Sequence, residues 1–142
     1  MDKTLQICQI NVNGLSNRTI TALDKFNHDL RIGVLALQET LLDNTTNHID
    51  KILNMETFHV TNSRGVSISA IPTLCPQQIT ELQDLVTDAV WITIKVESRV
   101  ILIGNFYINY SLSSDNNLKN ATNNIETALG FCSRSGITDL II

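Results

Sequence analysis

Two short segments, each at the end of an apolar run, carry residue types that could do chemistry. Asn11-Val12-Asn13-Gly14-Leu15 ends the first run, and Leu37-Gln38-Glu39-Thr40 ends the second. A carboxylate such as Glu39, placed where a buried strand meets solvent, loses hydration unless a cation or a donor compensates it. Carboxylate oxygens suit Mg²⁺, which usually takes one or two carboxylates together with water and substrate phosphate. The alternative is a glutamate that caps a helix or makes a surface ion pair.

The two asparagines of the first segment are candidates for positioning a ligand. Asn11 and Asn13 are two residues apart on a predicted strand, so we expect their side chains on the same side, with Val12 pointing into the core. Side-chain amides can position a carboxylate, a water or a phosphate oxygen without adding charge. They could equally be turn-forming residues that precede Gly14.

Two more residues are candidates for contact with a phosphate. Tyr107 ends an apolar strand, where its phenol could hydrogen-bond a phosphate or simply pack half-buried. Arg64, beside Gly65 in a predicted turn, could contact a phosphate or be an ordinary solvated residue. The three histidines share no local spacing, so we assign them no ligand role. The three scattered cysteines lack a CxxC spacing, which argues against a zinc site and a disulfide framework.

The elements that must position these residues can be predicted from the apolar pattern. Alternating or continuous apolar residues predict strands over Thr4–Val12, Ile32–Leu37, Thr57–Thr61, Val66–Ala70, Val90–Val96, Val100–Tyr107 and Ile137–Ile142. Apolar residues three and four apart predict helices over Thr19–Leu30 and Leu118–Cys132. Asp43–Asn54 is a short helix or an irregular loop, and Ile71–Leu85, which contains both prolines, stays unassigned. A strand–helix–strand opening followed by hairpins favours a layered α/β domain.

Composition sets limits on the class of protein. The 142 residues are 43% hydrophobic and 17% charged, which is ordinary for one globular domain. A net charge of -4 gives no support to a large non-specific nucleic-acid surface, although a magnesium-dependent nuclease can rely on a local basic patch. No run approaches the ~20 apolar residues of a membrane span, and no signal-peptide hydrophobic region follows Met1. We therefore expect an intracellular protein without a membrane partner.

The order and spacing of these motifs resemble the endonuclease/exonuclease/phosphatase superfamily, the fold of DNase I and exonuclease III. The resemblance rests on Ile10–Leu15, Leu35–Thr40, Arg64–Ile68, the strand around Trp91, and Phe106-Tyr107-Ile108. Within the superfamily the chain is most similar to the endonuclease domains of non-LTR retrotransposons, which precede a reverse transcriptase. The resemblance implies a partial DNase I-like four-layer α/β (α+β) sandwich, with mixed, mostly antiparallel sheets flanked by helices. Residues 1–142 would form a single, partial domain of this kind.

The resemblance also implies an activity and roles for the site residues. Glu39 would bind Mg²⁺ or Mn²⁺, and Asn13 would lie at the edge of the metal site. Asn11 would hydrogen-bond within the catalytic cluster, and Tyr107 would contact the scissile phosphate. The implied reaction is hydrolysis of a DNA phosphodiester by an activated water. DNA would be the partner, and the location nuclear or cytoplasmic.

The sequence departs from the family pattern at three points. Asn109 stands where the family usually has proline, and Gly65 is the one glycine of a normally glycine-rich turn. The family's Gly-Asp-x-Asn and Asp-His motifs are not found in these 142 residues. General-base help is worth ~10²–10⁴-fold, so we expect the N-terminal part of an endonuclease that is inactive alone. The alternatives are a non-catalytic, decayed retroelement fragment and a same-fold phosphatase that acts on a small phosphorylated substrate.

Overall fold

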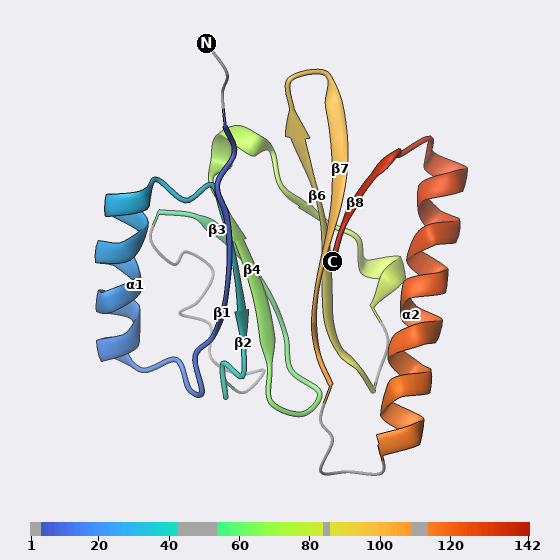
Figure 1. Ribbon diagram of the computed structural model, residues 1–142, viewed down its shortest axis with the longest axis horizontal. Helices are drawn as coiled ribbons and strands as arrows, with labels where there is room; N and C mark the ends of the chain where they lie inside the picture. Colours follow the sequence, from blue (N-terminus) through green and yellow to red (C-terminus); the bar gives the residue numbers. More distant parts are fainter. Residues whose placement is uncertain (1–3, 43–53, 84–85, 109–113) are drawn as a thin grey trace.

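The computed structural model describes residues 4–42, 54–83, 86–108 and 114–142. Two four-stranded sheets pack face to face, and a long helix covers the outer face of each (Figure 1). The layers are α1 (Asn17–Leu30), sheet 1, sheet 2 and α2 (Ser114–Ser135). This arrangement confirms the predicted fold class, a four-layer α/β sandwich with mixed sheets.

Sheet 1 has the strand order β1-β2-β4-β3 and combines parallel and antiparallel pairs. Its strands are β1 (Ile7–Asn11), β2 (Val34–Gln38), β3 (Glu56–Val60) and β4 (Val66–Ala70). β1 and β2 are parallel and joined through α1, whereas β4 is antiparallel to both β2 and β3. Because Asn11 lies opposite Gln38 in the parallel pair, β1 and β2 end at the same edge of the sheet.

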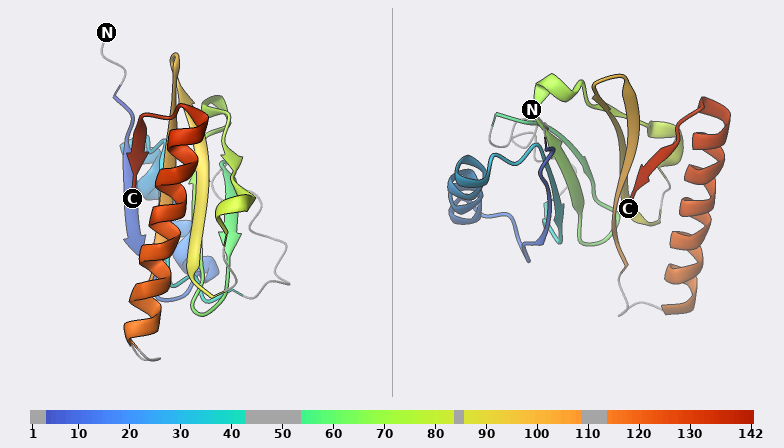
Figure 2. Two further views of the ribbon diagram at one scale, coloured as in Figure 1. Left: turned by 90° about the vertical axis from the view of Figure 1, so that its right-hand side faces the viewer. Right: turned by 45° about the horizontal axis from the view of Figure 1, so that its top comes forward.

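Sheet 2 has the strand order β5-β6-β7-β8. Its strands are β5 (Gln77–Gln78), β6 (Asp88–Val96), β7 (Arg99–Tyr107) and β8 (Asp139–Ile141). The β6–β7 hairpin places Tyr107 opposite Asp88, and β8 returns through α2 to lie parallel to β7. The edge strands β1 and β8 lie on the same side of the sandwich (Figure 2).

Three apolar clusters hold the four layers together, and they explain why β2 and β6 are hydrophobic on both faces. Between the sheets the core contains Val34, Ile68, Ile92, Ile94 and Ile103. Under α1 it contains Leu23, Leu35 and Leu37, and under α2 it contains Trp91, Leu102, Ala128 and Cys132. Successive residues of β2 and β6 therefore serve two different cores, as expected for strands buried on both faces.

The region left unassigned between β4 and β6 contains short elements instead of a long helix or strand. Two 3-10 turns, Pro72–Leu74 and Thr80–Leu82, flank β5. Proline has no N–H to donate, so this region makes one short strand at the edge of sheet 2. The predicted Asp43–Asn54 segment and the Asn109 departure fall largely or wholly outside the described residues. Among the described residues, no helix is long and apolar enough to cross a membrane.

Candidate active site

The predicted site residues meet at one rim of the sandwich, the lower rim in Figure 1. The carboxyl ends of β1, β2 and β7 and the turn between β3 and β4 all reach this rim. Backbone hydrogen bonds connect the segments, since Gly14 N donates to Glu39 O at 2.7 Å and Leu41 N donates to Arg64 O at 2.8 Å. These bonds join three of the four segments, the ends of β1 and β2 and the β3–β4 turn, into one hydrogen-bonded surface.

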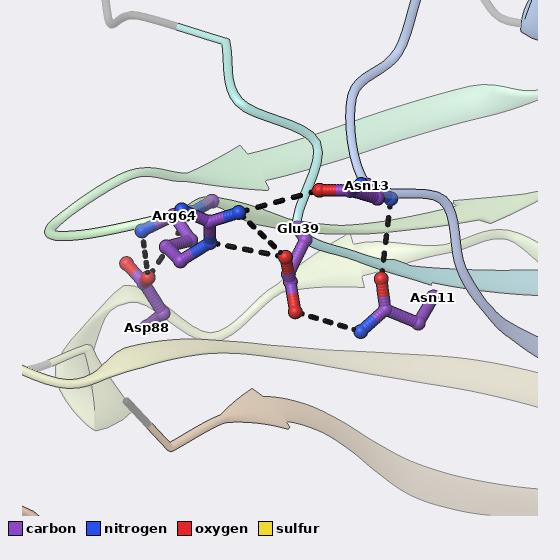
Figure 3. A network of polar contacts seen from close by, with 6 residues as sticks. Asn11, Asn13, Glu39, Arg64 and Asp88 are labelled. Carbon is purple, nitrogen blue, oxygen red and sulfur yellow. Dashed lines mark hydrogen bonds and ion pairs between the residues drawn. The ribbon is translucent and has the colours of Figure 1, made fainter. Parts of the chain in front are cut away.

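Glu39 is the centre of this surface. It follows β2 directly and has a left-handed backbone, with φ 54°. A non-glycine residue in this region costs of order 1–3 kcal/mol, and such residues cluster at functional sites. Its Oε1 accepts a hydrogen bond from Asn11 Nδ2 at 2.9 Å, and its Oε2 accepts from Arg64 Nε at 3.0 Å and Nη2 at 2.8 Å (Figure 3). The donors from Asn11 and Arg64 hold the pKa of the Glu39 carboxyl below its usual value.

Asn11 and Asn13 both belong to this network, although not by lying on one strand face. β1 ends at Asn11, and Asn13 lies beyond it with φ 44°, so the expected strand alternation does not extend this far. Asn11 Oδ1 instead accepts the Asn13 backbone N–H at 3.1 Å, which makes a local turn and directs Asn11 Nδ2 to Glu39. Turn formation and ligand positioning, the two interpretations of this pair, are thus compatible.

Arg64 lies in the β3–β4 turn and contacts both residues that were expected to face a metal. Its Nη2 donates to Glu39 Oε2 at 2.8 Å and to Asn13 Oδ1 at 3.3 Å (Figure 3). The hydrogen bond with Glu39 raises the pKa of the guanidinium. The surface ion pair considered as an alternative role for Glu39 is therefore present, and its partner is Arg64.

Asp88, which the sequence did not suggest, fixes the turn that carries Arg64. Its side chain is 2% exposed and accepts hydrogen bonds from the backbone N–H groups of four consecutive residues. The bonds from Arg64 N and Gly65 N are 2.7 and 3.1 Å long. Four donors compensate the burial of one carboxylate, and in return they fix the backbone of the turn. A charged residue at the start of the apolar β6 is the signal that could have revealed it.

Tyr107 ends β7 beside Glu39, as the sequence predicted for a strand-end phenol. Burial, and next to it the nearby Glu39 carboxylate, raises the pKa of the phenol. Tyr107 therefore stays protonated at neutral pH and can donate a hydrogen bond. The structure thus brings together all five residues singled out in the sequence: Asn11, Asn13, Glu39, Arg64 and Tyr107.

A second unforeseen residue, Asn105 in β7, connects the two sheets beneath the site. It is 2% exposed, and its Nδ2 donates to Leu37 O and Ser67 O, both at 2.9 Å. Gln38 Nε2 donates back across the same interface to Phe106 O at 2.5 Å. These contacts hold the end of β2, and so the start of the Glu39 segment, against sheet 2.

His59 lies behind the site, where its ring contacts the hydroxyls of Thr40 and Thr61. Its Nε2 is 2.8 Å from Thr40 Oγ1, and burial lowers the pKa of the imidazole. A neutral, hydrogen-bonded histidine in this place supports the backbone around Glu39. The prediction that no histidine is a ligand stays a prediction.

The oxygen atoms at the rim fit a divalent cation. Glu39 Oε2 and Asn13 Oδ1 converge on one cationic nitrogen, Arg64 Nη2, so the site already presents a carboxylate and an amide oxygen to a single positive charge. This donor set is of the hard, oxygen-only type that Mg²⁺ and Mn²⁺ prefer. Within the described ranges, no cluster of three or more His, Cys, Asp or Glu could hold a metal. Any cation here would rely on Glu39 for its charge and on water or substrate for its remaining ligands.

Comparison with known proteins shows which solved structures have a similar fold. No protein-family model and no curated protein sequence matches the chain. Among solved structures, the chain is similar to the AP endonuclease LMAP from Leishmania major, with a TM-score of 0.60 and 17% identity. The endonuclease domain of TRAS1, a telomere-specific non-LTR retrotransposon, has a TM-score of 0.63 and 14% identity. An endonuclease/exonuclease/phosphatase family protein from Leptotrichia buccalis has a TM-score of 0.53 and 17% identity.

The matches extend over most of this chain and over about half of the other proteins. They cover 82, 84 and 84% of this chain, and 47, 52 and 61% of the three structures in the same order. The chain has a DNase I-like fold, which it shares with these three structures.

Proposed function

We propose that this chain carries the glutamate side of a divalent-metal-dependent phosphodiesterase site that acts on DNA. One observation supports the proposal above the others. Glu39 Oε2 and Asn13 Oδ1 both accept from the same positively charged group, Arg64 Nη2. Asn11 binds the other oxygen of the Glu39 carboxylate, and these groups lie at the rim where the parallel strands end. Ligand sites of α/β folds concentrate at such strand ends.

Each residue has a separate task in this proposal. Glu39 and Asn13 would hold Mg²⁺ or Mn²⁺, and the cation would supply stabilisation of the charge that develops on phosphate oxygens. Asn11 keeps the Glu39 carboxylate oriented and, through the lowered pKa, ionised. Tyr107 stays protonated and donates to a phosphate oxygen. Arg64 contributes a second positive charge at the same rim.

DNA is the substrate that the comparisons favour. Two of the similar structures are named as endonucleases, and one of these is the domain of a non-LTR retrotransposon. By this analogy we propose a retrotransposon-type nuclease, with a reverse transcriptase downstream in the parent protein and a nuclear or cytoplasmic location. A same-fold phosphatase for small phosphorylated substrates and a non-catalytic retroelement fragment are the competing hypotheses.

We further propose that these 142 residues do not cleave DNA by themselves. The sequence contains no Gly-Asp and no Asp-His dipeptide, so the second acidic group and the histidine of the family's site are not supplied by it. Incubation of the chain with supercoiled plasmid and Mg²⁺ should leave the plasmid uncut. Nicking that Glu39→Ala abolishes would show that the chain assembles a complete site.

Metal binding tests the proposal without relying on cleavage. Free Mn²⁺, followed by electron paramagnetic resonance during titration, should show one site whose Kd rises at least ~10-fold in Glu39→Gln, since the Glu39 carboxylate brings a full negative charge to the ion whereas the Asn13 amide is neutral. Glu81→Gln is the matched control, because Glu81 is an exposed glutamate on the 3-10 turn beside α2. Mn²⁺ binding that is unaffected by Glu39→Gln would refute the proposed metal site.

The substrate class can be separated in the same system. Duplex DNA, abasic-site DNA and an inositol phosphate, each added at saturating Mn²⁺, compete for the same rim if they bind there. We expect DNA to bind more tightly than the inositol phosphate, and Tyr107→Phe to weaken the DNA complex. A preference for the inositol phosphate would favour the phosphatase hypothesis, and no binding of any of the three would favour the non-catalytic fragment.

A further inference from the structure

We propose that Arg64 is an internal competitor for the metal ion: its guanidinium takes the cation position at Glu39 and Asn13, and divalent metal binds only when Arg64 leaves it. The inference rests on the metal site proposed above and adds a step to its loading. It makes Arg64 a residue that sets metal affinity, beyond the phosphate contact expected from the sequence.

The contacts of Arg64 leave no room for simultaneous binding. Arg64 Nε and Nη2 lie 3.0 and 2.8 Å from the same atom, Glu39 Oε2, and Nη2 also lies 3.3 Å from Asn13 Oδ1. Mg²⁺ requires its oxygen ligands at ~2.0–2.1 Å in near-octahedral geometry. An ion on Oε2 and Oδ1 would therefore occupy the space that Nη2 fills, and its charge would repel the guanidinium.

Arg64 can leave the cation position without disturbing the fold. Its backbone is held independently of its side chain, because Arg64 N donates to Asp88 Oδ2 at 2.7 Å and Arg64 O accepts from Leu41 N at 2.8 Å. Its side chain is 37% exposed, so rotation of the side chain alone brings the guanidinium into solvent. The released group stays tethered at the rim by a fixed backbone.

The exchange changes the charge of the rim in a way that suits a phosphodiester. The Glu39–Arg64 pair is neutral, whereas Glu39 with a divalent cation and a released Arg64 sums to a charge of about +2 at short range. A phosphate that binds the released guanidinium makes its return to Glu39 less favourable. By linkage, metal should raise phosphate affinity and phosphate should raise metal affinity by the same factor.

The competition can be measured with Mn²⁺ as the probe and two matched arginine variants of the 142-residue chain. Arg64→Gln should lower the Kd for Mn²⁺ by about 2- to 5-fold, the upper part of the range expected from removing a partly exposed ion pair that the metal must break. Arg99→Gln removes an arginine from a second ion pair, with Asp139 in sheet 2, and should leave the Kd within about 2-fold.

A second measurement follows the displacement directly in the unmodified chain. The Nε–Hε resonance of Arg64 in ¹⁵N nuclear magnetic resonance spectra should move during a Mg²⁺ titration, with the same midpoint as metal binding. The corresponding resonance of Arg99 serves as an internal control and should not move. This readout does not depend on a variant or on cleavage.

The outcomes separate the inference from the function on which it rests. Mn²⁺ binding that needs Glu39 but is no tighter in Arg64→Gln, with an unmoved Arg64 resonance, overturns the competition and leaves the metal site standing. Absence of any Glu39-dependent binding, in the wild-type chain and in Arg64→Gln, removes both. Mn²⁺ binding that is detectable only in Arg64→Gln supports both the metal site and the competition, and it means that Arg64 outcompetes Mn²⁺ in the wild-type chain.

Discussion

Asn105 offers the sharpest test of how the site is supported, because its side chain bridges the two sheets directly below Glu39. Its Nδ2 donates to Leu37 O and Ser67 O at 2.9 Å, and all of this lies within the core, since Asn105 is 2% exposed. Asn105→Ala removes both donors and leaves a void between the sheets. The two carbonyl oxygens lose a partner in a place that water does not easily reach.

The expected cost follows from these contacts. Each of the two hydrogen bonds that Nδ2 donates contributes about 1 kcal/mol net. The longer bond that Asn105 Oδ1 accepts from Gln38 Nε2 at 3.3 Å adds little, because Gln38 Nε2 keeps Phe106 O as a partner. Truncation of a buried side chain adds about 1–2 kcal/mol for the void. The sum, about 3–4 kcal/mol, is a large part of the ~5–15 kcal/mol that stabilises a typical domain. At this chain length it corresponds to a Tm lower by about 10–15 °C.

Urea unfolding measures this cost with a built-in probe. Trp91 is the only tryptophan of the chain and is 1% exposed, so its fluorescence should report loss of the core between sheet 2 and α2. Asn123→Ala, an exposed asparagine on α2, is the matched control and should change the free energy of unfolding by less than about 0.5 kcal/mol. A loss below about 1 kcal/mol in Asn105→Ala, at an unchanged urea m-value, would refute the view that this bridge holds the sheets together.

Three further predictions concern the surroundings of the site. Gly65→Ala should lower the free energy of unfolding by about 2–4 kcal/mol, because φ is +86° and a Cβ would lie 2.3 Å from Thr40 Oγ1. Gly136→Ala is the control in the same urea assay. Gly136 has φ +68° but open space around it, so its substitution should lower the free energy by only about 1–2 kcal/mol. The pKa of Glu39 is lowered, so its contribution to stability is present above pH ~4.5 and lost as pH falls through the folded-state value. Glu39→Gln should therefore flatten the plot of unfolding free energy against pH in this range. A plot that the substitution leaves unchanged would contradict the hydrogen-bonded carboxylate. Burial lowers the pKa of His59, so the unfolded chain binds a proton at a higher pH than the folded chain does. The free energy of unfolding should therefore fall as pH drops below ~6.5. A nuclear magnetic resonance titration of the folded chain should place the midpoint of His59 below pH ~6.5.

The elements that depend on local pattern could be predicted from the sequence, and they include the strands that carry the site. Val90, Ile92 and Ile94 alternate along β6 and face the other sheet, as expected for a strand of a sandwich. The end of β1 was placed one residue too far, because Asn13 takes a left-handed backbone that the periodicity of apolar residues does not record. Glu39 and Tyr107 were identified by their position at strand ends and Arg64 by its place in a turn, and the structure brings them together at one rim.

The supporting residues could not be predicted, because their partners are distant in the sequence. Asp88 accepts from a turn that begins 26 residues earlier, and Asn105 donates to carbonyls 68 and 38 residues earlier. Neither residue belongs to a spaced motif, and each is a single polar residue in an apolar strand. The pairing of Arg64 with Glu39, 25 residues apart, is of the same kind. Such contacts follow from the register of the sheets and become visible only when the topology is known.

The spacing of the site's contacts along the chain has a consequence for how the protein folds. Asn11 contacts Glu39 over 28 residues, Glu39 contacts Arg64 over 25, and Arg64 contacts Asp88 over 24. Each contact closes a loop of similar, moderate length, so the entropy lost at each step is nearly equal, about 3 kcal/mol. One hydrogen bond contributes only about 1 kcal/mol net. No contact of the network therefore compensates its own loop closure, and the network forms only as the sheets that carry it pair.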